Sequence, residues 1–315
     1  MPGKTCRRKT VRHKAVRTLV HGYAALLVRG RLWDGRTVPL VAGRYGPEAG
    51  PALPLVVLGD SSALTVGVME ARHTNGARLA GDLVAEWGCA VDLDVPARAG
   101  VTTAGMARQV EDVAARNKPG VALILIGGND VMVPVSLRRS AARLGYYVRL
   151  LRASGWEVVV GACADIGAAP ALRRAVRGPA SRRSRVLARR QAAAALRAGA
   201  VVVSLSMEDF RHQPERLYCP DGFHPNADGY LLYERRAAVA VSAAAGRLPA
   251  VTPREPAGRP DEVFPDGWEA ARHVTREPGA CFVPAQAGGP VSLHRYRPRQ
   301  RRDAATCPSP VTTAP

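Results

Sequence analysis

The chain has 315 residues, of which 47% are hydrophobic, so it is not wholly disordered and can bury a sizeable core. Forty-five basic and 26 acidic residues give a formal net charge of +19. Only four basic residues are Lys, which indicates an Arg-rich compositional bias; a surface for nucleic acid or anionic lipid is the alternative. The six Cys form no C-x-x-C pair, so their spacing predicts neither a zinc site nor a disulfide framework.

The first 50 residues form a basic N-terminal segment. Residues 1–40 carry ten basic residues and one acidic residue, a net charge of +9. A helix is predicted from Lys14 to Val28, and a Gly/Pro-rich connector follows at Ala42–Pro54. We see no clear signal-peptide cleavage site and no run of about 18 apolar residues, so we expect a cytoplasmic protein. An amphipathic helix over residues 10–30, bound peripherally to a membrane surface, is the alternative.

From residue 51 to 246, short apolar runs alternate with longer stretches of helical spacing. This alternation predicts an α/β domain with a mainly parallel five-stranded sheet and helices on both of its faces. The predicted strands are Leu55–Leu58, Val91–Leu93, Val121–Ile126, Val158–Gly161 and Val201–Leu205, and the predicted helices are Asn75–Trp87, Ala104–Arg116, Val135–Ala153, Ser181–Ala198 and Asn226–Ala245.

The run "SRRSRVLARR" at Ser181–Arg190 is interpreted as a solvated helix face, with a site for an anionic partner as the alternative. Residues 247–315 differ in composition from the preceding domain. Pro and Arg are frequent there and the apolar periodicity fades, which predicts a largely disordered tail.

Small and polar loops follow the predicted strands, at the sheet edge where open parallel sheets bind ligands. Gly59-Asp60-Ser61 follows the first strand, Gly100 follows the second, and "GGND" at Gly127–Asp130 follows the third. "CPDGFHPNADGY" at Cys219–Tyr230 precedes the last predicted helix. We therefore expect these four loops to meet at one site.

The residue types in these loops suit acyl transfer. A serine hydroxyl is a weak nucleophile and needs an adjacent base, and His224 is the candidate base for Ser61. Asp221, three residues before His224, is placed to accept the other ring N–H and to stabilise the imidazolium. The oxyanion of a tetrahedral intermediate needs hydrogen-bond donors. The backbone N–H groups of Ser61 and Gly100 and the side-chain amide of Asn129 are the candidates.

These loops resemble the conserved blocks of the SGNH hydrolases, the GDSL-type esterase and lipase superfamily. "GDS" resembles block I, Gly100 the block II glycine, "GGND" block III, and "DGFHP" at Asp221–Pro225 block V, in the family's order over residues 55–245. The sequence departs from many relatives in having Ser62 after the candidate nucleophile and no Asn before Gly100.

The resemblance implies a flavodoxin-like three-layer α/β/α sandwich. It also implies a Ser61-His224-Asp221 triad, an oxyanion hole of Ser61, Gly100 and Asn129, and no metal or organic cofactor. Apart from the resemblance, Asp60 is interpreted as a structural hydrogen-bond acceptor and not a catalyst, and Asp130 as a residue that fixes its loop.

The leading hypothesis is a serine esterase that hydrolyses small-molecule or glycan esters through an acyl-enzyme. One alternative is an acyltransferase or deacetylase acting on a sugar or cell-wall polymer. Another is an interaction protein that binds nucleic acid or anionic membrane through residues 1–40, with the hydrolase domain as scaffold.

Overall fold

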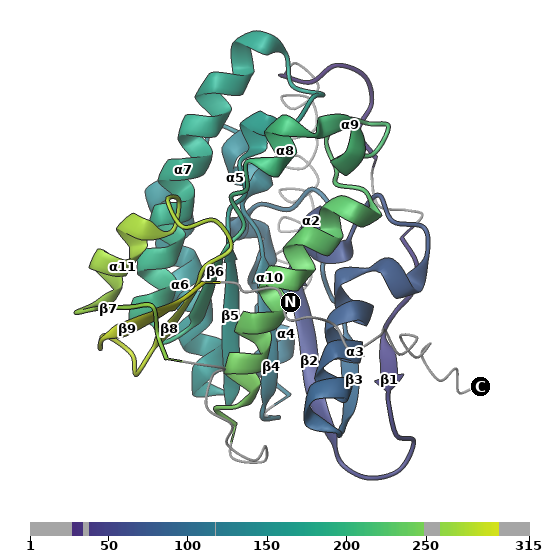
Figure 1. The fold of residues 1–315 in the computed structure, drawn as a ribbon, viewed down its shortest axis with the longest axis vertical. Coiled ribbons are helices and arrows are strands. Elements are labelled where there is room, and N and C mark those ends of the chain that lie inside the picture. The colour runs from purple at the N-terminus through teal and green to yellow at the C-terminus, as the bar shows by residue number, and fades with distance from the viewer. Residues whose placement is uncertain (1–26, 34–37, 117, 249–258, 296–315) are drawn as a thin grey trace, which may run out of the picture.

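A computed structural model describes residues 27–33, 38–116, 118–248 and 259–295, which form a central sheet with helices on both faces (Figure 1). Only the last two residues of the helix predicted at Lys14–Val28 fall within these ranges. The other predictions made for residues 1–26 lie outside the described residues.

Five parallel strands form the centre of the sheet. They are β2 (Ala52–Gly59), β3 (Ala90–Asp94), β4 (Gly120–Leu125), β5 (Trp156–Ala162) and β6 (Val201–Ser204). Their order is β3-β2-β4-β5-β6, with every neighbouring pair parallel. Counted along the chain, this is the flavodoxin-like order 2-1-3-4-5, so the predicted fold class is confirmed. The strand order reverses between β2 and β4, and ligands bind beyond that point in sheets of this kind.

The parallel strands are buried on both sides, which explains their unbroken apolar runs. All six residues of β4 are buried, for example. One face packs against α4 (Ala107–Ala114), α6 (Leu137–Ala153), α7 (Arg174–Arg197) and α11 (Gly267–His273), and the other against α3 (Asn75–Trp87) and α10 (Ala227–Ala245). Shorter helical segments are α2 (Ser61–Leu64), η1 (Ala71–His73), η2 (Thr103–Met106), α5 (Gly128–Met132), η3 (Ile166–Ala168), α8 (Asp209–His212) and α9 (Pro214–Leu217).

Four further strands extend the sheet to nine, more than the five expected. At one edge, β1 (Gly43–Tyr45) pairs antiparallel with β3. At the other edge, β8 (Cys281–Pro284) pairs antiparallel with β6 and is followed in the sheet by β9 (Val291–His294) and β7 (Glu262–Phe264).

Residues 259–295 therefore differ from the disordered tail expected after residue 246. Their strands have only three or four residues each and lie among Pro and Gly. Strands this short do not show the alternation of apolar and polar residues by which a strand is predicted from sequence. Residues 259–295 are ordered by long-range pairing, since β8 adds to the otherwise open edge of β6 and β9 pairs with β8. Phe282 on β8 and Val291 and Leu293 on β9 are buried. The remainder of the predicted tail lies outside the described residues.

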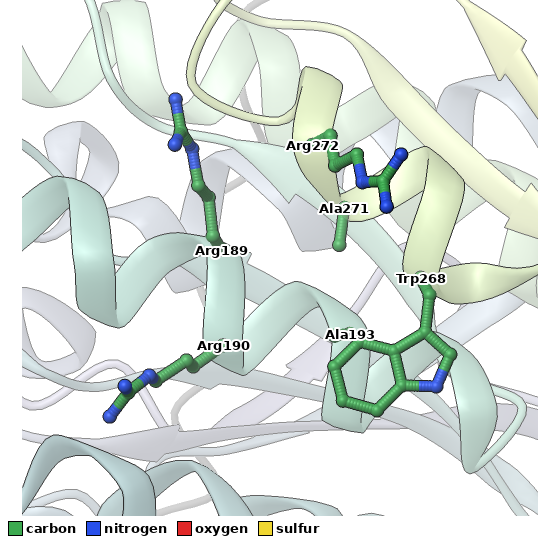
Figure 2. Close-up of a pocket in the computed structure, with 6 residues that line it drawn as sticks. All are labelled: Arg189, Arg190, Ala193, Trp268, Ala271 and Arg272. Carbon is green, nitrogen blue, oxygen red and sulfur yellow. The ribbon is translucent and has the colours of Figure 1, made fainter.

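α7 and α11 pack against each other beside β8, and a recess of about 320 Å³ opens between them (Figure 2). Among the described residues, no helix combines the length and the apolar composition that crossing a bilayer requires.

Candidate active site

The turn that carries Ser61 follows directly from the end of β2. Gly59 has a φ of 141°, and a Cβ there would lie 1.8 Å from the carbonyl oxygen of Leu125 on β4, so only glycine fits. The amide of Gln109 holds the same glycine, accepting from its N–H at 3.0 Å and donating to its carbonyl at 3.1 Å. The chain therefore leaves the sheet at a fixed point beside the strand reversal.

Ser61 is the first residue of α2 and is partly exposed. The preceding residue, Asp60, is the N-cap, and its Oδ1 accepts the backbone N–H of Ser62 at 2.9 Å. The turn closes where the N–H of Val66 donates to the carbonyl of Ser61 at 3.0 Å. These bonds fix the backbone on both sides of the Ser61 hydroxyl.

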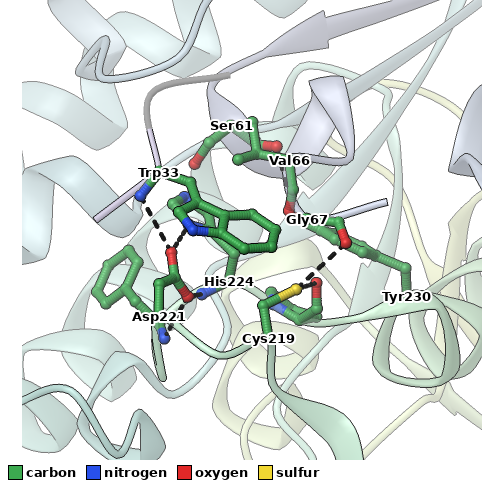
Figure 3. Close-up of polar contacts among 10 residues, drawn as sticks. Trp33, Ser61, Val66, Gly67, Cys219, Asp221, His224 and Tyr230 are labelled. Atoms are coloured by element: carbon green, nitrogen blue, oxygen red, sulfur yellow. Dashed lines mark hydrogen bonds and ion pairs between the residues drawn. The ribbon is translucent and has the colours of Figure 1, made fainter. Parts of the chain in front are cut away.

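His224 and Asp221 form a hydrogen-bonded pair in the loop before α10. Nδ1 of His224 lies 2.7 Å from Oδ2 of Asp221, and His224 is 5% exposed. Oδ1 of Asp221 accepts the backbone N–H groups of Phe223 and His224 at 2.9 and 3.0 Å, while Oδ2 also accepts the N–H of Trp33 at 3.2 Å. Figure 3 shows the imidazole between Asp221 and Ser61.

The Asp221 carboxyl is held in its ionised form. Burial alone would raise its pKa, but the hydrogen bond and positive charge that His224 offers, with the two backbone N–H donors of its own loop, bring the pKa below its ordinary value. An ionised Asp221 accepts a hydrogen bond from Nδ1–H, so the proton stays on Nδ1 and the free lone pair of His224 is on Nε2, the nitrogen turned away from the carboxylate.

The Ser61 turn and the His224 loop are packed against each other. Sγ of Cys219 lies 3.3 Å from the carbonyl of Gly67, and the hydroxyl of Tyr230 donates to the carbonyl of Val66 at 3.1 Å. A Cβ at Gly67 would lie 2.7 Å from the carbonyl oxygen of Pro225. No hydrogen bond between the Ser61 hydroxyl and His224 is formed within the described part of the chain. Catalytic hydrogen bonds are often open without substrate.

The candidate oxyanion donors lie on three neighbouring loops. Asn129 follows β4, and its Nδ2 donates to the carbonyl of Val101 at 2.9 Å and lies 3.4 Å from Oδ2 of Asp60. Gly100 has a φ of 76°, a turn conformation that side chains disfavour. Within the described ranges, no hydrogen bond engages the backbone N–H of Ser61 or of Gly100, so both donors are available.

Asp60 and Asp130 face these loops from inside the protein. Burial raises the pKa of Asp60 to about 6, although the backbone N–H of Ser62 acts in the opposite direction. Asp130 accepts the N–H and the hydroxyl of Thr103 at 2.8 and 3.1 Å and the hydroxyl of Ser140 at 2.6 Å. The Asp130 bonds join the loop after β3 to α6.

Two contributors were not predicted from the sequence. The buried side chain of Gln109, on α4, holds Gly59, and a polar residue on an otherwise apolar helix face was the available signal. Trp33 contacts Asp221 through its backbone, which leaves no signal in the residue type. Within the described ranges, no three His, Cys, Asp or Glu side chains come together as metal ligands would.

Known proteins resemble this chain over the same region. The model of the GDSL-like lipase/acylhydrolase family matches residues 57–232, which include all five candidate site residues. The GDSL-like esterase Rv1075c of Mycobacterium tuberculosis is 36% identical over 182 residues, which are 56% of this chain and 58% of that protein. The match thus spans less than two-thirds of that relative.

Among solved structures, a mutant of Axe2, described as an acetyl-xylooligosaccharide esterase from Geobacillus, superposes with a TM-score of 0.50. The two chains are 19% identical, and the superposition covers 62% of this chain and 96% of Axe2. This likeness concerns the fold.

Proposed function

The chain belongs to the GDSL-like lipase/acylhydrolase family, and from this premise we propose that it is a serine esterase in which Ser61, His224 and Asp221 act as the triad. The SGNH resemblance given by the sequence motifs is thereby confirmed at the level of the family. The observation that carries the proposal is the 2.7 Å pair of His224 and Asp221 in a loop packed against the Ser61 turn.

In the proposed reaction, the Ser61 hydroxyl attacks the ester carbonyl while Nε2 of His224 takes its proton. Asp221 keeps the proton on Nδ1 and stabilises the imidazolium as it forms. His224 then gives its proton to the departing alcohol, which leaves an acyl group on Ser61. Water, deprotonated by the same imidazole, attacks this acyl-enzyme and releases the carboxylic acid.

The negative charge of each tetrahedral intermediate would be met by the N–H groups of Ser61 and Gly100 and by the amide of Asn129. Support comes from the two backbone donors, which have no partner within the described residues. Nδ2 of Asn129 donates to the carbonyl of Val101 and lies 3.4 Å from Oδ2 of Asp60, so the amide must release one of these two acceptors to donate to an oxyanion.

The proposed substrates are carboxylic esters of small molecules or glycans. The first test is the initial rate on p-nitrophenyl esters of increasing acyl length, with wild type, Ser61→Ala and Ser62→Ala compared side by side. We expect activity on the short esters to vanish in Ser61→Ala alone. Labelling by a fluorophosphonate probe, located by mass spectrometry, should fall on Ser61 in both wild type and Ser62→Ala.

A folded wild-type protein that is neither active nor labelled would contradict the proposal. Labelling together with acyl transfer to a sugar in place of water would keep the triad and redefine the acceptor.

A further inference from the structure

The two helical layers of the protein differ sharply in charge. On one face of the sheet, α4, α6, α7 and α11 together contain 15 Arg and three acidic residues, and α6 and α7, which hold 13 of these Arg, contain no Asp or Glu. On the other face, α3 and α10 together contain three Arg and four acidic residues. A compositional bias toward Arg does not explain this difference, because it would affect both faces equally.

Large apolar side chains are exposed on the same basic face. Tyr146 on α6 is 55% exposed, Trp268 on α11 is 55% exposed, and Val186 on α7 is 38% exposed. Because α6, α7 and α11 share one buried cluster beneath the sheet, the exposed side chains of these helices point away from it, toward solvent. The face therefore combines positive charge with aromatic and aliphatic groups, a combination typical of proteins that lie on membrane surfaces.

The recess between α7 and α11 brings these features together. Its floor is lined by Ala193, Ala271 and Trp268, and its rim by three arginines, Arg189, Arg190 and Arg272. The side chain of Arg190 points away from the other lining residues (Figure 2). The only carboxylate bound to this rim within the described ranges is Glu269, which contacts Arg272 at 3.3 Å. A cationic rim above an apolar floor is complementary to an amphiphilic anion.

We propose that the α6–α7–α11 face is a docking surface for a bilayer containing anionic phospholipid, with a phosphate headgroup held by the arginines of the recess. The apolar floor favours lipid over a nucleic-acid duplex, because the glycerol and upper acyl chain of a lipid can contact Ala193, Ala271 and Trp268, whereas a duplex presents its phosphates and keeps its bases paired and stacked. The proposal concerns residues 137–197 and 267–273, not the basic segment before residue 41, and it does not depend on ester hydrolysis.

The test is co-sedimentation of the full chain with vesicles of phosphatidylcholine, with and without phosphatidylglycerol. Wild type should bind only the vesicles that contain phosphatidylglycerol, and added salt should release it. The double variant R189E/R190E should bind at least about tenfold more weakly, since each basic residue near an anionic surface accounts for about fivefold in partition. Ser61→Ala should bind like wild type, which separates this test from that of the esterase.

A matched control makes the same charge change on the other side of the molecule. R72E/R235E reverses two exposed arginines outside the basic face and should bind within about twofold of wild type. A second variant, Trp268→Ala, tests the apolar part and should weaken vesicle binding at unchanged charge. Unaltered thermal melting of each variant shows that folding is not the cause.

Equal vesicle binding by wild type and R189E/R190E would overturn the proposal and assign the binding to other basic residues. Failure of wild type to bind the anionic vesicles would also overturn it. So would binding to a DNA or RNA duplex at a salt concentration that releases the vesicles, because the face would then be a nucleic-acid surface.

Discussion

The backbone N–H of Trp33 donates to Oδ2 of Asp221 at 3.2 Å, and this is the oxygen that faces Nδ1 of His224 at 2.7 Å. The segment before the hydrolase core therefore contributes directly to the candidate triad. Two backbone bonds hold this segment in place, from the N–H of Arg29 to the carbonyl of Ala171 and from the N–H of Arg173 to the carbonyl of Leu27. The loop it binds is joined to the triad loop as well, since Ala171 donates to the carbonyl of Gly222 at 2.8 Å.

Replacing Trp33 by proline removes this N–H, whereas Trp33→Ala keeps it and removes only the indole. We expect kcat/KM to fall about tenfold more in Trp33→Pro than in Trp33→Ala, because a hydrogen bond to a charged acceptor is worth about 1.5–3 kcal/mol. The measurement is kcat/KM on a short p-nitrophenyl ester, with thermal melting as the control for folding. Equal losses in the two variants would show that the backbone donor has no part in positioning Asp221.

Ser61→Ala and His224→Ala should each lower kcat by a factor on the order of 10⁴ to 10⁶, because a triad acts as a unit. For the same reason, the double variant should be no more than about tenfold slower than either single variant. The measurement is kcat for all four proteins under one set of conditions. Additive losses would mean that the two side chains contribute independently, which the proposed proton transfer does not allow.

Much of the fold and the candidate site followed from the sequence because the relevant information is local. The five parallel strands are buried on both faces, so each appears as a short apolar run, and β4 is buried throughout. Ser61, Asp221 and His224 have reactive side chains in loops whose positions follow from those strands. Their meeting at one edge follows from the parallel arrangement.

The parts that were missed depend on long-range backbone contacts. Trp33 and Asp221 are 188 positions apart and meet through a main-chain N–H, which any residue except proline would supply. Strand β8 exists as a strand because β6 offers it an open edge, and its four residues alone do not specify that partner. The basic face could not be predicted from the sequence either, because only the structure shows that α6 and α7 lie on the same side of the sheet.

Asp60 should make the stability of the protein depend on pH. Its pKa rises from 3.8 unfolded to about 6 folded, chiefly through burial, so the folded state binds the extra proton between these values. The contribution of Asp60 to stability is therefore fully present below the unfolded pKa and is lost as the pH rises through about 6, by roughly 3 kcal/mol at 1.36 kcal/mol per pKa unit. Asp60→Asn cannot ionise and should lack this loss.

The measurement is urea unfolding of wild type and Asp60→Asn at several pH values between about 4 and 7.5, since the difference between the two proteins cancels the other titrating groups. The unfolding free energy of Asp60→Asn should increase relative to that of wild type as the pH rises. A difference that stays constant over this range would mean that Asp60 is not kept neutral by its burial.

Gly67 joins the Ser61 turn to the His224 loop and should tolerate no side chain. Its φ is 110°, and a Cβ there would lie 2.4 Å from Sγ of Cys219 and 2.7 Å from the carbonyl oxygen of Pro225. The backbone contact cannot be relieved by a rotamer change, so Gly67→Ala must displace the loop that carries His224. We expect a loss of about 2 kcal/mol or more in unfolding free energy, together with a lower kcat.

Gly178 in α7 is the control, since its φ is ordinary and a Cβ there meets no atom within 4 Å apart from its chain neighbours and its own helix backbone. Gly178→Ala should change the unfolding free energy by less than about 1 kcal/mol, because the higher helix propensity of Ala is opposed by the restriction that Pro179 places on the preceding residue, and kcat should be unchanged. The test is to measure the free energy of urea unfolding and kcat for Gly67→Ala and Gly178→Ala. If Gly67→Ala behaved like Gly178→Ala, the two loops would not be in the close contact on which the alignment of Ser61 with His224 depends.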